Sequence, residues 1–535
     1  MFHNTPTLTR LALRRERTMS TVWVLMLASV LAMIYITFGS AMADEASRTQ
    51  LAGMMGNPAM VAMCGPVYGQ DNFTIGAMYT VMMLLFTAIA VAVANIIFVV
   101  RHTRADEEKG RYEVVRSLPV GRLSNLHAAM ISAVLVNIVM GLVVALALFL
   151  IGRGESSITL NGALLWGTIL MAIGLVFASI AALFAQLSSS SRGAKGYSFT
   201  ALAVSYLLRG AGDAGGIEWL SRISPMGLIL RAQPFIENHW WPVPILLLTA
   251  VGIAGIAYRL NLRRDIDQGL LPDKSGKPYG GKLLTHHIGL ALKLLLPLLI
   301  IGIVTMSLTA ASYGSIIGDI DGFIKSNAFY KQLLLHVDGF TMPQLFAGMI
   351  TMQMSIFSLI FLLLYINKAK GEEKEHRSEL ILSAPIKRAS YLNGYAVISF
   401  IASIVLQLVT AFSLYVVASQ LLNSPADLPL RGLIEANLAY LPAQWAFLGL
   451  ALFLIGVAPK LTGLIWAAFG VSFFGAMFGN MQGLTWLGNL SPHGMLPQLP
   501  METINWTTVI VMLAVALSLT TLGFIGYRRR DIGVV

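Results

Sequence analysis

The sequence is poor in charged residues and has a single cysteine. Asp, Glu, Lys and Arg make up 12% of its 535 residues, whereas hydrophobic residues make up 56%. Soluble domains carry about 25% charged residues, and the mean hydropathy here is +0.72. This composition excludes an ordinary soluble protein and predicts an all-α integral membrane protein. The lone Cys64 excludes an intrachain disulfide.

The short motifs of many enzymes are missing as well. No G-x-x-x-x-G-K-[ST] phosphate loop occurs, and the nearest string, Ser275-Gly276-Lys277-Pro278, has Pro where the hydroxyl residue belongs. No H-E-x-x-H, G-x-S-x-G or Cys/His metal spacing is present either. We therefore expect neither catalysis by this chain alone nor a cofactor or metal bound to it.

The sequence is dominated by apolar runs long enough to cross a membrane, which takes about 20 residues each. We predict twelve, near residues 20–42, 75–100, 127–152, 158–186, 197–211, 242–258, 288–312, 341–366, 391–419, 432–458, 460–480 and 505–526. Most Lys and Arg residues fall on the segments that share a side with the N-terminus, which predicts cytoplasmic termini. Asp and Glu are nearly absent from these runs, and this weighs against proton coupling.

One charged segment occurs twice, 266 positions apart. Residues 106–122 read DEEKGRYEVVRSLPVGR and residues 372–388 read EEKEHRSELILSAPIKR. Six positions are identical in the two segments: Glu107/Glu373, Arg111/Arg377, Glu113/Glu379, Ser117/Ser383, Pro119/Pro385 and Arg122/Arg388. The strings Ser224-Pro225-Met226-Gly227 and Arg263-Arg264-Asp265-Ile266 also recur, as Ser491-Pro492-His493-Gly494 and Arg529-Arg530-Asp531-Ile532. The repeats predict duplication and fusion of one unit.

The repeat divides the chain into a first six-span domain at 1–265, a linker at 266–285 and a second six-span domain at 286–535. An even number of spans returns each unit to its starting side, so the two copies are expected to be parallel. Residues 7–18 are predicted to form a short basic surface helix before the first span. The long segments 212–241 and 479–504 are predicted to be half-inserted helices, the alternative being ordinary loops.

The duplicated segment can form a helix over residues 105–118, ending before Pro119. An i,i+4 ion pair is expected between Glu107 and Arg111. On a helical wheel one packing stripe is shared by Glu107, Arg111, Val114 and Leu118, and its counterpart by Glu373, Arg377, Leu380 and Ala384. Glu113 and Glu379 lie off this stripe and would present an acidic face to a cytoplasmic partner. The alternative is a solvated loop that only connects two spans.

At these residues the chain resembles the permeases of ATP-binding-cassette exporters. The carrying pattern is E-x-G followed by L-P-x-x-R, from Glu108 through Leu118-Pro119 to Arg122, together with Gly56-Asn57-Pro58-Ala59-Met60 in the first outer loop. Two fused copies most resemble the exporters of polyketide antibiotics. The resemblance covers the whole chain, and the second copy departs from the pattern with Lys374 and His376.

That resemblance implies a coupling helix between spans 2 and 3 of each unit, contacting a separate ATPase subunit present in two copies. The implied coupling residues are Glu107, Glu108, Arg111, Glu113, Pro119, Arg122, Glu373, Arg377, Glu379, Pro385 and Arg388. ATP and Mg²⁺ would be bound by that partner and not by this chain.

Met and Phe side chains at corresponding places in spans 2 and 8 are candidates for a substrate cavity, because flexible apolar groups suit varied cargo. They are Met78, Met82, Met83 and Phe86, with Met349, Met352, Gln353 and Phe357. The alternative is core packing or contact with lipid. If they line a cavity, the cargo is hydrophobic or amphipathic.

Together these features predict the permease of an ATP-driven drug or antibiotic exporter in a bacterial plasma membrane, surrounded by lipid and with no nucleic-acid partner. Two other functions stay open at this point. One is a secondary, ion-coupled transporter with parallel six-span repeats. The other is a membrane scaffold or sensor that recruits a cytoplasmic partner. The sequence does not identify the cargo.

Overall fold

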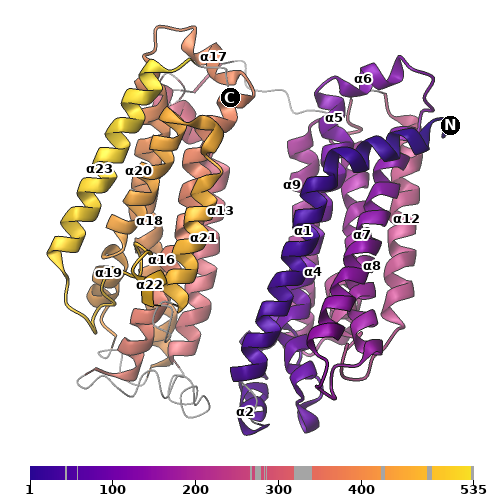
Figure 1. Ribbon diagram of the computed structural model, residues 1–535, viewed down its shortest axis with the longest axis horizontal. Helices are drawn as coiled ribbons and strands as arrows, with labels where there is room; N and C mark the ends of the chain where they lie inside the picture. The colour runs from indigo at the N-terminus through magenta and orange to yellow at the C-terminus, as the bar shows by residue number, and fades with distance from the viewer. Residues whose placement is uncertain are drawn as a thin grey trace. The chain divides into compact units, whose positions relative to one another are not determined.

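The chain forms two compact units, Met1–Ser275 and Gly276–Val535, and each is a bundle of helices (Figure 1). The computed structural model describes residues 1–41, 45–56, 58–265, 268–271, 279–281, 284, 286–318, 340–422, 428–478 and 485–531. Within these ranges the regular elements are helices, and no strand occurs. Most of the predicted linker 266–285 lies outside the described residues, as do Asn57 of the first outer loop and residues 479–484 of the second half-inserted segment.

Among its described residues the first unit has six helices of 22 residues or more, with several shorter ones between them. Its elements are α1 (Thr5–Ala41), α2 (Glu45–Met55), α3 (Pro58–Cys64), η1 (Gln70–Asn72), α4 (Ile75–His102), α5 (Arg104–Glu108), α6 (Arg111–Arg116), α7 (Ser124–Ile151), α8 (Leu160–Leu187), α9 (Ser191–Ala214), α10 (Glu218–Ile223), α11 (Pro225–Leu230) and α12 (Pro242–Arg263).

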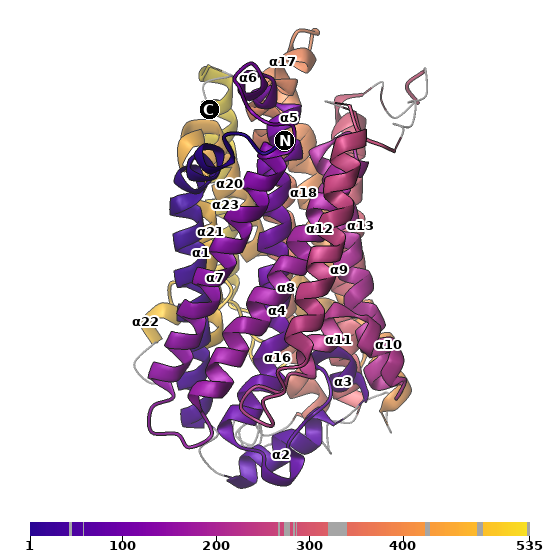
Figure 2. The same cartoon turned by 90° about the vertical axis from the view of Figure 1, so that its right-hand side faces the viewer.

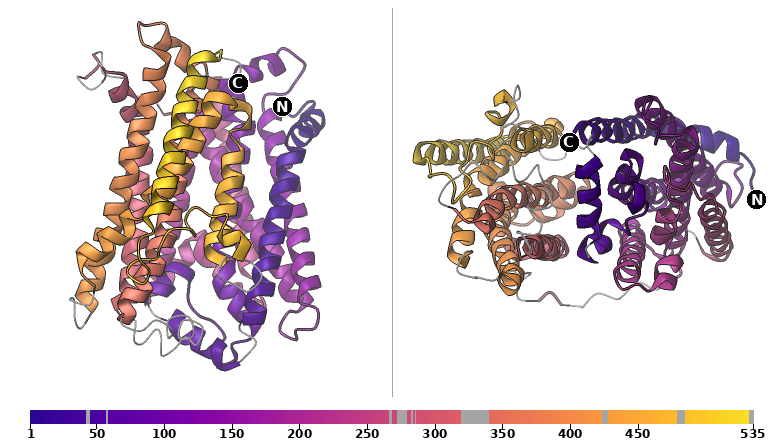
Figure 3. Two further views of the ribbon diagram at one scale, coloured as in Figure 1. Left: turned by 60° about the vertical axis from the view of Figure 1, so that its left-hand side comes forward. Right: turned by 90° about the horizontal axis from the view of Figure 1, so that it is seen from below.

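The second unit repeats this order with small differences. Its elements are α13 (His287–Gly318), α16 (Met342–Lys374), α17 (Arg377–Leu382), α18 (Arg388–Leu421), α19 (Leu430–Leu438), α20 (Leu441–Val457), η4 (Pro459–Leu461), α21 (Leu464–Phe478), α22 (Thr485–Gly488) and α23 (Trp506–Arg529). The yellow helix α23 lies along α20 (Figure 3, left).

The second and fourth long helices lie at the centre of each unit. In the first unit these are α4 and α8, whose apolar windows are more buried than those of α1, α7 and α12. Trp166 of α8 is fully buried, and its ring centroid lies 5.2 Å from that of Tyr79 on α4. In the second unit α16 and the span containing α20 take the central places. The duplication seen in the sequence therefore extends to which helices form the core.

Ten helices among the described residues are long and apolar enough to cross a membrane. They account for ten of the twelve predicted spans, and the count of twelve is not confirmed. The two others hold the same fifth place in each unit. In the first unit α9 carries Arg192, Lys195 and Arg209 and is too polar, whereas the described part of α21 is only 15 residues long.

Glycines allow neighbouring long helices to approach closely. Gly141 of α7 faces Gly167 of α8, and a Cβ added to either would overlap the carbonyl oxygen of the other. In the second unit a Cβ added to Gly456 of α20 would overlap the carbonyl oxygen of Gly523 on α23, and one added to Gly523 would overlap that of Leu452. Small residues at crossing points let backbones pack closely where no water drives association.

Residues 7–18 are helical, as predicted, but they do not form a short helix of their own, because α1 is continuous from Thr5 to Ala41. In Figure 1 its first turns run across the end of the bundle before the helix turns along it. Residues before and within these turns attach to the segment between α4 and α7. Asn4 donates to the carbonyl of Pro119 at 2.8 Å, and Arg15 pairs with Asp106 at 2.6 Å.

The segment between α9 and α12 folds back against the bundle at the opposite end from α6. Figure 2 shows α10 and α11 beside the lower part of α9. All six residues of α11 except its first proline are buried, in contact with α4, α8 and α9. This is consistent with short helices in the predicted half-inserted segment 212–241.

Candidate functional site: a duplicated arginine–glutamate clamp

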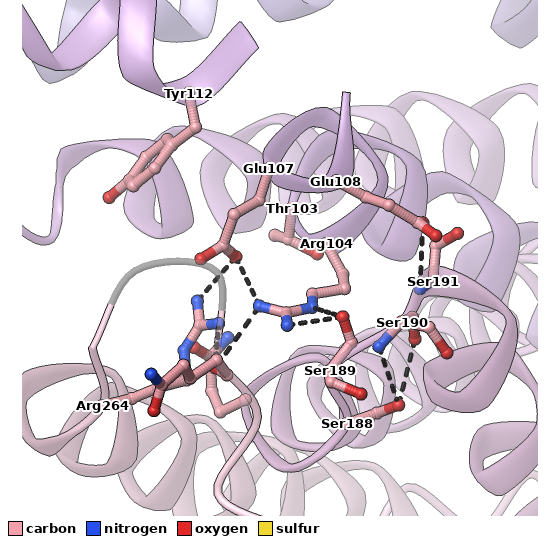
Figure 4. Close-up of polar contacts among 12 residues, drawn as sticks. Thr103, Arg104, Glu107, Glu108, Tyr112, Ser188, Ser189, Ser190, Ser191 and Arg264 are labelled. Atoms are coloured by element: carbon pink, nitrogen blue, oxygen red, sulfur yellow. Dashed lines mark hydrogen bonds and ion pairs between the residues drawn. The ribbon is translucent and has the colours of Figure 1, made fainter. Parts of the chain in front are cut away.

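Three chain connections of the first unit meet at one end of the bundle. They are the segment between α4 and α7, the serine-rich link Ser188–Ser191 between α8 and α9, and the chain that follows α12 (Figure 4). Three residues that fasten them, Arg104, Glu107 and Arg264, are charged and buried, although charged residues are scarce in this chain. A buried charge is stable only when it is paired and hydrogen-bonded.

Glu107 is at the centre of this arrangement. Its side chain is 5% exposed, and its Oε2 accepts from Arg264 at 2.7 Å and lies 3.0 Å from Arg104. Arg104 is 1% exposed and also donates from Nε to the carbonyl of Ser189 at 2.9 Å and from Nη1 to that of Gln268 at 3.5 Å. One carboxylate thus holds the end of α4, the α8–α9 link and the chain after α12 together.

Arg122 completes the connection from the far side of the segment. Its Nη2 donates to the carbonyl of Arg264 at 3.0 Å. A cavity of about 10 Å³, lined in part by Glu107, Tyr112, Gln186 and Arg264, lies within the cluster. A space of that size with polar walls suits one water molecule.

The second unit repeats the arrangement at equivalent positions. Glu373 is 1% exposed and accepts two bonds from Arg530, each at 2.6 Å, in the paired geometry that makes arginine–carboxylate contacts strong. Arg388 donates to the carbonyl of Arg530 at 2.8 Å. Lys370, at the position of Arg104, donates to the carbonyl of Pro459 at 2.6 Å. We call these two sets the Arg–Glu clamps: Arg104, Glu107, Arg122 and Arg264 in the first unit, and Lys370, Glu373, Arg388 and Arg530 in the second.

The predicted helix over 105–118 is wrong, because the chain breaks it at Gly110. Gly110 has φ of 68°, and His376, at the equivalent position, has φ of 57°. Both values lie in the left-handed region, which ends a helix and which L-residues rarely adopt. The result is two short helices, α5 and α6, in the first unit, and the junction of α16 with α17 in the second.

The break also changes the ion pairs. Arg111 pairs with Asp106 at 2.9 Å and not with Glu107, and Arg377 pairs with Glu372 at 2.6 Å. The expected Glu107–Arg111 pair is therefore wrong, because the turn at Gly110 carries Arg111 away from Glu107. In each unit the observed ion pair joins the residues on either side of the turn, Asp106 to Arg111 and Glu372 to Arg377.

The apolar stripe predicted to pack on the bundle faces away from it. Val114 is 69% exposed, Leu118 is 59% exposed and Leu380 is 76% exposed. The buried side chains of the two short helices are Tyr112 in α6 and Ser378 in α17. Only Glu107 and Glu373 of the predicted stripe are buried, and they serve the clamps.

Each short helix thus presents an exposed acidic and apolar end. We call these the α6 tip, made of Glu113, Val114, Leu118 and Pro119, and the α17 tip, made of Glu379, Leu380, Ala384 and Pro385; all eight residues are exposed. At the α17 tip Glu379 lies 2.7 Å from the His376 ring, and this hydrogen bond raises the pKa of His376 above its usual value. The α6 tip has no such partner in sequence, because Gly110 stands there.

Glu108 has a different role from its neighbour. Its carboxylate accepts from the backbone amide of Ser191 at 3.2 Å, at the start of α9, where the helix dipole favours a negative charge. The second unit has the exposed Lys374 at this position, so the two units differ here.

The clamp residues outside the repeated segment were not predicted. Arg264 and Arg530 lie in the duplicated R-R-D-I strings, and Arg104 and Lys370 are cations 266 positions apart. The constant offset between the two units therefore marked these four residues as candidates. Their pairing was not visible, because nothing in the local sequence shows that the end of the sixth span returns to the segment after the second.

A second duplicated contact lies at the other end of each unit. Ser224 donates to the carbonyl of Ser205 at 2.6 Å, and the two hydroxyl oxygens are 2.8 Å apart. Ser491 makes the same bond to Ser472 at 2.8 Å, with hydroxyls 3.0 Å apart. These serines join the fifth helix of each unit to the segment that follows it.

The eight candidate cavity residues fall into different environments within their own units. Met78 and Met352 are buried, Phe86 is 44% exposed, and the others are half-buried: Met82, Met83, Met349, Gln353 and Phe357. Phe357 stacks on Phe473 with ring centroids 6.4 Å apart. Their role in binding stays a prediction. Within the described part of the chain no group of three or more His, Cys, Asp or Glu side chains could hold a metal ion.

Comparison with known proteins gives two matches. The family model of the multidrug efflux system permease Rv1217c, C-terminal domain, matches residues 7–259 and 284–528, which are the two halves of the repeat. The multidrug efflux system permease protein Rv1217c of Mycobacterium tuberculosis is 30% identical over 536 aligned positions, covering 99% of this chain and 96% of that protein.

Proposed function

The chain belongs to the family of the multidrug efflux system permease Rv1217c, and from that premise we propose that it is the membrane-spanning permease of an ATP-driven exporter. The relative's name supports an efflux role, and the cargo that we propose is hydrophobic or amphipathic. A separate ATPase subunit, in two copies, supplies the energy and binds ATP and Mg²⁺. The chain lies in a bacterial plasma membrane with both termini in the cytoplasm.

The observation that carries this proposal is the pair of Arg–Glu clamps beneath the exposed tips. A partner that pushes on the α6 tip displaces the short segment between α4 and α7. Because Glu107 fastens that segment to Arg264, the displacement moves the end of α12 as well. The second unit has the same path from the α17 tip through Glu373 to Arg530 and α23.

Buried ion pairs suit this task because they are costly to break. Removing one partner of a buried pair costs about 3–5 kcal/mol, since it leaves a charge without compensation. A loop fastened in this way transmits a movement instead of absorbing it. An exposed ion pair contributes only about 0.2–1 kcal/mol, so it would break before it transmitted such a movement.

The two tips are chemically unequal, and we infer that the partner binds them unequally. At the α17 tip the carboxylate of Glu379 is shared with His376, whereas Glu113 has no histidine beside it in the sequence. A cationic surface on the ATPase would therefore meet more uncompensated negative charge at the α6 tip. Like charges across such a contact cost several kcal/mol, so charge reversal is a strong test.

The experiment separates docking from transmission. Glu113→Lys combined with Glu379→Lys reverses both tips and is expected to abolish co-purification of the ATPase. Glu107→Gln leaves both tips unchanged and is expected to retain the ATPase while lowering cargo-stimulated ATP hydrolysis and export. Glu218→Gln, in an exposed i,i+4 pair with Arg222, is the matched control and should behave like the wild type.

Two results would contradict the proposal. Retention of ATPase and export in the double tip variant would show that the partner does not dock at these residues. Export that persists without any ATPase and stops with a protonophore would instead establish an ion-coupled transporter.

A further inference from the structure

The second unit contains a buried polar cluster at the middle of its spans. Gln407 of α18 donates from Nε2 to the hydroxyls of Ser355 and Ser358 on α16, at 3.3 and 3.1 Å. Gln444 of α20 donates to the same two hydroxyls, at 3.0 and 2.7 Å. All four side chains belong to residues with 0% exposure. Two carboxamides from different helices thus converge on one pair of serines.

The cluster has more hydrogen-bonding capacity than its own members use. The Oε1 atoms of Gln407 and Gln444 have no hydrogen-bond partner among the described residues. The same holds for the hydroxyl of Tyr440 and for both ring nitrogens of His493, each fully buried. A buried polar atom without a partner costs about 1–3 kcal/mol. Five such atoms in one region are a large cost to maintain without a function.

These atoms lie along one surface. Tyr440, Gln444 and Phe447 are spaced i, i+4 and i+7, which places them on one face of the span that contains α20. The ring of His493 lies 6.2 Å from those of both Tyr440 and Phe447, centroid to centroid. Polar atoms therefore extend from mid-span toward the end of the unit that carries Ser491.

The first unit has no equivalent. At offsets of 266 and 267 positions, Gly141 stands for Gln407 and Met226 for His493. The spans 160–187 and 430–457 are offset by 270 positions, so Gly174 stands for Gln444 and Leu170 for Tyr440. The buried amides of the first unit, Asn95 and Asn137, bond reciprocally at 3.1 and 2.6 Å. The fold can thus be built without the cluster, and polar groups inside a membrane bundle usually mark a functional path.

We propose that this cluster is a binding site, present in the second unit alone, for an uncharged apolar molecule that carries a hydroxyl group. None of its six polar residues is charged at neutral pH, since burial lowers the pKa of His493 to about 3. An ionised ligand would lack a counter-charge, at a cost that excludes it. A hydroxyl both donates and accepts, so it satisfies a carboxamide in either orientation. The rings of Tyr440 and Phe447 supply apolar contact for the rest of the molecule.

All six residues are fully buried in this structure, so binding requires α16, α18 and α20 to separate. The identification of the bound molecule as cargo rests on the proposed export function. Binding itself does not depend on that function. A binding assay on the purified chain without any ATPase therefore tests the site independently.

The assay compares two probes that differ in one hydrogen-bond donor: 2-naphthol and its methyl ether, 2-methoxynaphthalene. Their affinities are measured by equilibrium dialysis against the full chain in lipid nanodiscs, with empty nanodiscs to correct for partition into lipid. The free energy of opening reduces both affinities equally and cancels from their ratio. We expect 2-naphthol to bind about tenfold tighter, the ratio that about 1.4 kcal/mol of hydrogen bonding gives.

Variants place the effect at the cluster. Gln407→Leu combined with Gln444→Leu should bring the ratio to about one, whereas Asn95→Leu combined with Asn137→Leu, the matched amide pair of the first unit, should leave it unchanged. His493→Met introduces the residue that the first unit has in the same motif, so it should fold and should lower the ratio as well. Equal affinities for the wild type, or a tenfold ratio that survives both the glutamine and the histidine changes, would overturn the proposal.

Discussion

Replacing Glu107 by Gln should destabilise the first unit by about 4 kcal/mol. The change removes the carboxylate that two buried cations, Arg104 and Arg264, share, and removal of one partner from a buried pair costs about 3–5 kcal/mol. The corresponding Glu373→Gln should cost less, about 3 kcal/mol, because Arg530 is 13% exposed and water can partly compensate it. The difference follows from one carboxylate serving two cations in the first unit.

Equilibrium unfolding of the purified chain in mixed detergent micelles can measure these free energies. Glu218→Gln is the control, because its pair with Arg222 is 65% and 58% exposed and should contribute less than about 1 kcal/mol. A double change, Glu107→Leu with Arg264→Leu, should recover most of the loss, since replacing both partners of a buried pair by apolar residues is often nearly neutral.

Either of two results would contradict a buried, stabilising pair at Glu107. A loss below about 1 kcal/mol for Glu107→Gln would mean that water compensates Arg104 and Arg264 in solution. Equal losses in the Glu107→Leu and Arg264→Leu single variants that add in the double variant would mean that the two side chains do not interact.

Other features give predictions that can be checked by simpler measurements. Ser224→Ala should cost about 1–2 kcal/mol in the same unfolding assay, because it removes a buried hydrogen bond; no change would show that this contact is dispensable. Gly167→Val should cost about 1–3 kcal/mol by forcing α7 and α8 apart, and a neutral result would contradict the close approach. Glu379 raises the pKa of His376, so this pair stabilises α17 below the usual histidine pKa and the contribution disappears as pH rises through the raised value. An NMR titration should show the His376 pKa falling in Glu379→Gln; an unchanged value would refute the pairing.

Much of the architecture could be predicted because it depends on patterns that extend over many residues of the sequence. Ten of the apolar runs became candidate spans, and both duplicated strings around Ser224 and Arg264 became duplicated contacts. Such features depend on composition over many residues or on one constant offset, so a single local exception does not disturb them.

The details of the candidate site could not be predicted, because they depend on one backbone angle. A helical wheel assumes an unbroken helix, and the left-handed turn at Gly110 resets the phase of every residue after it. The wheel therefore placed Val114 and Leu118 inward, whereas both are exposed. The left-handed turn at His376 was harder to predict than the one at Gly110, because a positive φ is uncommon for residues other than glycine.

The buried polar cluster was also invisible in the sequence. Ser355, Gln407 and Gln444 lie in mainly apolar runs, where a few uncharged polar residues have little effect on the mean hydropathy. Their significance arises only when three helices bring them together.

The most direct test of the account is purification of the tagged chain in mild detergent from its own host, followed by reconstitution into vesicles. We predict that a soluble ATPase accompanies the chain at two copies per permease and that uptake of a lipophilic dye into inside-out vesicles requires ATP hydrolysis. A chain that purifies alone and moves the dye without ATP would contradict the central claim.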